Sequence, residues 1–102
     1  MDKKTAVKIA KDYVRFLNSH TSYKVAKAFL FGSSVKNRFR ADSDIDIAII
    51  LKRYNDTLNG LANLMRLRRK FDLRIEPHHM DEKDFQINTP FTQEIRKGTK
   101  IL

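Results

Sequence analysis

The hydrophobic and polar positions along the chain predict several helices. From residue 3 to about residue 19, apolar residues recur three or four positions apart, as on one face of an amphipathic helix. The same spacing recurs from Leu58 to about Lys70. Thr89-Pro90 then opens a short final helix, expected over residues 91–97, because threonine caps and proline begins helices well. Gly98 stands where such a helix would end.

Three other segments have the pattern of strands. Residues 27–31, KAFLF, form a short apolar run that Gly32 halts. Residues 44–51, DIDIAIIL, are nearly continuous and β-branched, which is typical of a central strand covered on both faces. Residues 71–76, FDLRIE, alternate apolar and charged side chains, and Pro77 is expected to end this strand. The order of these elements predicts a small α/β layer fold.

The length and composition limit the possible domain organisation and classes of site. The 102 residues predict a single domain, 1–102, and a hydrophobic fraction of 41% with a charged fraction of 32% fits a small soluble protein. The absence of cysteine excludes disulfides and thiolate metal sites. No segment has the pattern of a secretory signal or of a membrane span, so we expect no membrane association and a cytoplasmic location.

The charge balance favours polyanionic partners. The formal net charge is +9, from 21 Lys+Arg against 12 Asp+Glu, which suits nucleic acid, nucleotide phosphates or an acidic protein. The basic run RLRRK, 66–70, could bind nucleic acid directly. We favour a solvated helix face, since cations are stabilising near a helix C-terminus. His78 and His79 are expected in a surface loop, because adjacent side chains of an extended chain point apart.

Asp44 and Asp46 are the candidate centre of the chemistry. Residues two apart in a strand point to the same face, so the two carboxylates should project together, opposite to Ile45 and Ile47. Two negative charges so close need compensation, and a divalent cation is the simplest. Oxygen-only ligands favour Mg²⁺ or Mn²⁺. The alternative is that Asp44 caps a turn and Asp46 is solvated at the start of the strand.

A turn rich in anion-binding groups precedes these aspartates. Gly32 follows a strand and Ser33 follows Gly32, which lets backbone N–H groups and a hydroxyl approach an anion. Lys36 and Arg40 lie between this turn and Asp44. A nucleoside triphosphate with bound magnesium would satisfy the turn, the cations and the aspartates together.

A third carboxylate would complete such a site. Asp72 and Glu76 both lie in the predicted strand 71–76, on the face opposite to its apolar residues. If that strand lies beside residues 44–51, Asp72 comes within reach of Asp44 and Asp46. We favour Asp72 over Glu76, which lies farther along and next to Pro77.

Taken together, these residues resemble a known family. Gly32-Ser33, ten further residues, Asp44-Ile45-Asp46 and the later Asp72 are similar to the pattern of the nucleotidyltransferase superfamily that includes DNA polymerase beta. The spacing most resembles the minimal nucleotidyltransferases, which are usually encoded beside a HEPN-domain protein in prokaryotic toxin–antitoxin pairs. The resemblance implies an α/β fold in which a small mixed β-sheet is flanked by helices.

The resemblance also assigns roles on the phosphate side of the site. It implies that Gly32 and Ser33 bind the triphosphate of a nucleotide. Many relatives carry an arginine directly after Gly-Ser, and this chain has Ser34 there. Lys36 or Arg40 is therefore left to meet the phosphates.

On the metal side, the resemblance implies that Asp44, Asp46 and Asp72 hold Mg²⁺ or Mn²⁺. The implied reaction is transfer of AMP from ATP to an acceptor hydroxyl. In the toxin–antitoxin pairs the implied acceptor is a tyrosine of the HEPN toxin, so that the transferase acts as an antitoxin. A chain of 102 residues lacks the extra helical domain of larger relatives, so we expect the acceptor on a separate protein.

A hypothesis of another class stays open. The chain could be a non-catalytic binding protein that neutralises a toxin, or binds nucleic acid, through its basic surface. Its affinity for the partner should then fall steeply with salt. The presence of three candidate metal-binding carboxylates favours the enzyme.

Overall fold

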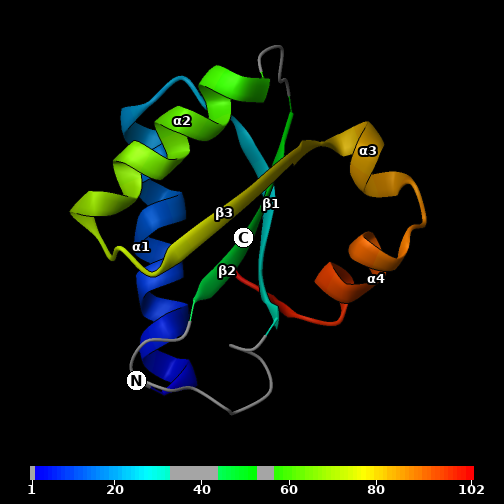
Figure 1. Cartoon of the computed structure of the whole chain (residues 1–102), viewed down its shortest axis with the longest axis horizontal. Helices are drawn as coiled ribbons and strands as arrows, with labels where there is room; N and C mark the ends of the chain where they lie inside the picture. Colours follow the sequence, from blue (N-terminus) through cyan, green and yellow to red (C-terminus); the bar gives the residue numbers. More distant parts are fainter. Residues whose placement is uncertain (1, 33–43, 53–56) are drawn as a thin grey trace.

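The computed structural model describes residues 2–32, 44–52 and 57–102 (Figure 1). The elements follow one another along the chain as α1 (Lys3–His20), β1 (Val25–Phe31), β2 (Ile45–Leu51), α2 (Thr57–Leu67), the 3₁₀ turn η2 (Arg68–Lys70), β3 (Ile75–Asp81), α3 (Glu82–Gln86), α4 (Pro90–Arg96) and β4 (Thr99–Lys100). Among the described residues no helix is both long and apolar enough to cross a membrane.

The strands form one mixed sheet in the order β3-β2-β1-β4. β1 pairs antiparallel with β2 and with β4, whereas β2 and β3 are parallel and are joined through α2. A parallel pair needs such a crossover because its strands start at the same edge of the sheet. The expected small mixed sheet flanked by helices is therefore confirmed.

The apolar residues of β2 divide between two cores, one on each face of the sheet. Ile45, Ile47 and Ile49 pack with α1 and α2, whereas Ala48 and Ile50 pack with Phe85 of α3 and with Ile95 of α4. Figure 1 shows the same division, with α1 and α2 on one side of the sheet and α3 and α4 on the other. The prediction of a central strand covered on both faces is confirmed.

The third strand lies later in the chain than expected. β3 spans Ile75–Asp81, so the prediction of a strand over 71–76 is wrong for its first four residues, which form a turn. Pro77 lies inside β3 and does not end it. The sheet tolerates this proline because β3 is an edge strand, where a missing N–H need not break a ladder. His78 and His79 consequently belong to a strand and not to a surface loop.

The C-terminal helix agrees with its prediction. Thr89 caps α4 in a reciprocal capping box with Thr92, Pro90 opens the helix, and Gly98 follows the C-cap residue Lys97. The short elements α3 and β4 had no clear pattern in the sequence. In the structure, β4 pairs with β1 beside Leu30, so it adds a fourth strand to the sheet.

Candidate active site

Gly32 and Asp46 meet at one edge of the sheet. Phe31, the last residue of β1, is the antiparallel partner of Asp46, so Gly32 turns away directly beside the aspartate. Gly32 has a positive φ of 75°, and a Cβ built on it would lie 2.6 Å from Asp46 Oδ2. Only glycine permits both the backbone conformation and this close approach.

Asp46 projects from the face of β2 that was expected. Its neighbours Ile45 and Ile47 are fully buried in the core beneath α1 and α2, whereas the Asp46 side chain is 24% exposed on the opposite face. Asp44 stands directly before β2 and is exposed. The alternation of exposed and buried residues over 44–47 agrees with two carboxylates on one face.

Glu76 is the carboxylate that the neighbouring strand brings beside Asp46. The parallel register of β2 and β3 pairs Asp46 with Glu76, so their side chains share a face on strands about 4.8 Å apart. The Glu76 side chain is 40% exposed, and Arg68 Nη1 lies 3.4 Å from its Oε1. The same Arg68 nitrogen donates a 2.8 Å hydrogen bond to the Ile75 carbonyl, which fixes the guanidinium at the edge of β3.

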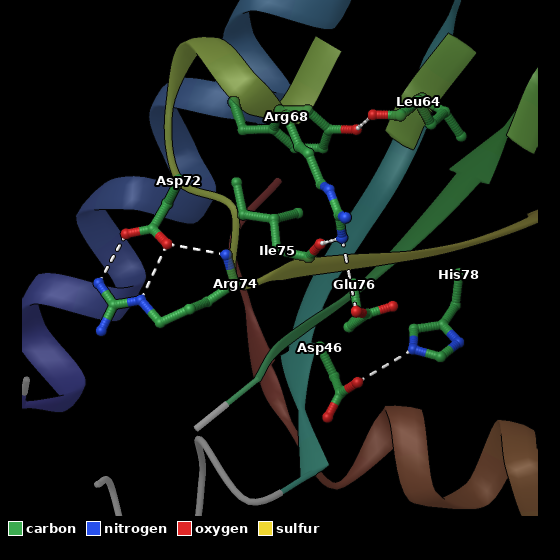
Figure 2. A network of polar contacts seen from close by, with 9 residues as sticks. Asp46, Leu64, Arg68, Asp72, Arg74, Ile75, Glu76 and His78 are labelled. Atoms are coloured by element: carbon green, nitrogen blue, oxygen red, sulfur yellow. Dashed lines mark hydrogen bonds and ion pairs between the residues drawn. The ribbon is translucent and has the colours of Figure 1, made fainter. Parts of the chain in front are cut away.

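The Asp72 carboxylate is paired with Arg74 and not with Asp46. Its carboxylate accepts hydrogen bonds from Arg74 Nε at 2.9 Å and Arg74 Nη2 at 2.6 Å, and a third from the Arg74 backbone N–H at 2.9 Å. The hydrogen bonds from the Arg74 side chain are the main cause that lowers the pKa of Asp72. Figure 2 shows Asp72 turned toward Arg74, away from the pair of Asp46 and His78. The expected approach of Asp72 to Asp46 on an adjoining strand is therefore not seen, because residue 72 lies in the turn before β3.

His78 is a neighbour of the site that the sequence did not reveal. Its Nε2 lies 3.0 Å from Asp46 Oδ1, and the pair is drawn in Figure 2. In β3, Glu76 and His78 are two residues apart, so both point to the face that carries Asp46. The alternation over residues 75–81 would have given this signal if the strand had been placed there.

Each of these carboxylates has its own partner within the protein. Asp46 contacts His78, Glu76 contacts Arg68 and Asp72 contacts Arg74. Among the residues that the structure describes, no group of three or more Asp, Glu, His or Cys side chains could hold a metal ion as placed. The donors still fit a hard cation, because Asp46 and Glu76 are adjacent, partly exposed carboxylates with Asp44 just ahead of β2. Mg²⁺ needs only one or two carboxylates, since it keeps waters and takes phosphate oxygens.

The remaining residues predicted for nucleotide binding, Ser33, Lys36 and Arg40, lie outside the described residues. Gly32 is described, and its φ is positive.

Comparison with known proteins adds one finding to this geometry. The family model described as "Polymerase beta, Nucleotidyltransferase" matches residues 11–102. The match includes every strand of the sheet as well as Gly32, Asp44, Asp46 and Glu76. A search of curated proteins finds no match for the chain.

Proposed function

The chain belongs to the polymerase beta nucleotidyltransferase family, and from this premise we propose that it transfers AMP from ATP to a hydroxyl of a partner protein. The observation that carries the proposal is the meeting of Gly32, Asp46 and Glu76 at one edge of the sheet. This edge combines a glycine of positive φ, where we propose that the phosphate chain binds, with adjacent carboxylates suited to Mg²⁺.

The proposed reaction forms one bond and breaks one. The acceptor hydroxyl oxygen attacks the α-phosphorus of ATP, the P–O bond to pyrophosphate breaks, and the hydroxyl proton leaves to a nearby base. Bound Mg²⁺ or Mn²⁺ would neutralise phosphate charge and favour ionisation of the hydroxyl. Asp44, Asp46 and Glu76 are the residues that would hold the metal.

We assign the third carboxylate to Glu76 in preference to Asp72. Glu76 is the register neighbour of Asp46 and is 40% exposed, so it can reach a ligand without rearrangement of the strand. Asp72 is 15% exposed and would have to give up its hydrogen bonds with Arg74. A catalytic role of Asp72 is the competing proposal, and substitution of each residue separates the two.

On the phosphate side, Gly32 is proposed as a triphosphate contact on the strength of the resemblance, and its lack of a side chain leaves room there for the Asp46 carboxylate. Ser33, Lys36 and Arg40 are proposed as phosphate-binding partners on the strength of the resemblance. The same resemblance supports a tyrosine of a HEPN toxin as the acceptor, and an antitoxin role for this chain.

The proposal is tested by incubating the protein with ATP, Mg²⁺ and the product of its neighbouring gene, the proposed partner, then measuring the intact mass of that partner. We expect the mass to rise by one or more AMP units. Asp46→Asn should abolish this increase while circular dichroism shows an unchanged fold. An unchanged partner mass with all four nucleoside triphosphates would contradict the proposal.

The alternative, a non-catalytic basic binding protein, is supported by the net charge of +9 and by the exposed Arg66, Arg69 and Lys70. It predicts that the partner is neutralised without change of mass, and equally well by Asp46→Asn. It also predicts that the complex weakens steeply as salt is raised.

A further inference from the structure

We infer that His78 is a positioning residue that fixes the orientation of the Asp46 carboxylate for metal binding, an inference that rests on the proposed function. His78 Nε2 lies 3.0 Å from Asp46 Oδ1, at hydrogen-bonding distance. The two residues come from neighbouring parallel strands, with His78 in register with Ala48, two residues beyond Asp46. The parallel register of β2 and β3 therefore brings the two side chains together.

The two oxygens of Asp46 have different surroundings. Oδ1 accepts from His78, whereas Oδ2 lies over Gly32, where a Cβ would come within 2.6 Å. A rotation of the carboxylate would break the hydrogen bond on one side and change the contact with the backbone on the other. His78 and Gly32 together thus hold a single orientation.

Other aromatic residues brace the His78 ring. The Phe31 ring meets it edge-on at a centroid distance of 5.1 Å, and the Phe91 ring lies 5.8 Å away. Phe31 and Phe91 also contact each other edge-on at 5.7 Å. The three rings come from β1, β3 and α4, so the position of Nε2 is set by three elements.

This arrangement matters because hydrogen bonds to ligating groups orient them for the metal. Removal of such an outer partner typically lowers metal affinity about 10–100-fold. The opposite role makes the opposite prediction. If the hydrogen bond to His78 kept Asp46 away from the metal, removal of the imidazole would raise the affinity for the metal. Measurement of metal affinity therefore decides the matter by the direction of the change.

The test compares His78→Phe with His78→Gln. Phenylalanine keeps a ring against Phe31 and Phe91 but has no donor, whereas the glutamine amide places an N–H near the position of Nε2. Mn²⁺ binding to the otherwise intact protein is measured by calorimetry and by electron paramagnetic resonance, without nucleotide or partner. His20→Phe is the matched control, since His20 is exposed on α1 and stacks on Phe16.

We expect His78→Phe to weaken Mn²⁺ binding by about 10-fold or more. His78→Gln should stay within a few-fold of the wild type, and His20→Phe should equal it. Unchanged or tighter binding by His78→Phe would overturn the inference, as would equal losses in His78→Phe and His78→Gln. Absence of Mn²⁺ binding by the wild type would also overturn the inference, whereas the proposed function fails only if the partner's mass stays unchanged in the transfer assay, so the two failures are distinguishable.

Discussion

At the scale of single residues, Glu76 and Asp72 differ in what their removal should cost. Glu76→Gln keeps the shape of the side chain and removes a proposed metal ligand, whose electrostatic contribution is several kcal/mol. We expect the rate of AMP transfer to fall by about 100-fold or more. Asp72→Asn should leave that rate within a few-fold of the wild type. Steady-state kinetics on the two variants measure this, and the reverse pattern would assign the third carboxylate to Asp72.

The pH dependence of stability provides a second prediction for Asp72. Hydrogen bonds from Arg74 lower its pKa in the folded protein below the ordinary value of 3.8. The ion pair therefore stabilises the fold fully at pH values above about 4, and this contribution is lost as the pH falls through the lowered pKa. Asp72→Asn should reduce the free energy of unfolding by about 1 kcal/mol at neutral pH.

As the pH falls through the lowered pKa of Asp72, the wild type and Asp72→Asn should converge, because the wild-type carboxyl then becomes protonated as well. Denaturant unfolding of both proteins across the acid range measures the difference. A gap that stays constant with pH would show that the charge of Asp72 contributes nothing.

At the scale of the elements, one buried hydroxyl links α1 to α2. Tyr13 is fully buried and its hydroxyl donates a 2.7 Å hydrogen bond to the Leu64 carbonyl. Tyr13→Phe should lower the free energy of unfolding by about 1 kcal/mol, since the bond is lost without change of packing. Tyr23→Phe is the control, because the Tyr23 hydroxyl makes a longer, 3.3 Å bond to Gly60 in a less buried place. Equal losses in urea unfolding of the two variants would contradict the special role of Tyr13.

Most of the helices and strands, but not the position of β3, could be predicted from the sequence. α1, β1, β2, α2 and α4 follow from hydrophobic spacing and helix capping, because their apolar residues enter one of the two cores. The position of β3 could not be read in this way. The alternation over 71–76 continues through a turn held by Asp72 and Arg74, and Pro77 is tolerated only because β3 is at the edge of the sheet.

The residues of the candidate site were predictable where they lie on or beside β1 and β2, and not where they lie on β3. Gly32 and Asp46 were predictable, because each stands at the boundary of a strand that the sequence marks clearly. Prediction of Glu76 and His78 as neighbours of Asp46 required the register between β2 and β3. A strand placed a few residues too early gives a different register and different neighbours. The expectation that Asp72 approaches Asp46 rested on placing the strand over residues 71–76.

At the scale of the whole molecule, the net positive charge and the carboxylates of the candidate site should control different properties, so Asp46→Asn should change AMP transfer without weakening association with polyanions. The loss of one of the 12 acidic residues in Asp46→Asn raises the formal net charge from +9 to +10. Any non-specific association with a DNA duplex, which needs only the net positive charge, should therefore be equal or slightly stronger in the variant, and it should weaken steeply between about 50 and 200 mM salt. Transfer of AMP should nevertheless disappear. Fluorescence anisotropy with labelled DNA, run beside the transfer assay, measures both, and a parallel loss of the two activities would mean that Asp46 maintains the fold and not the chemistry.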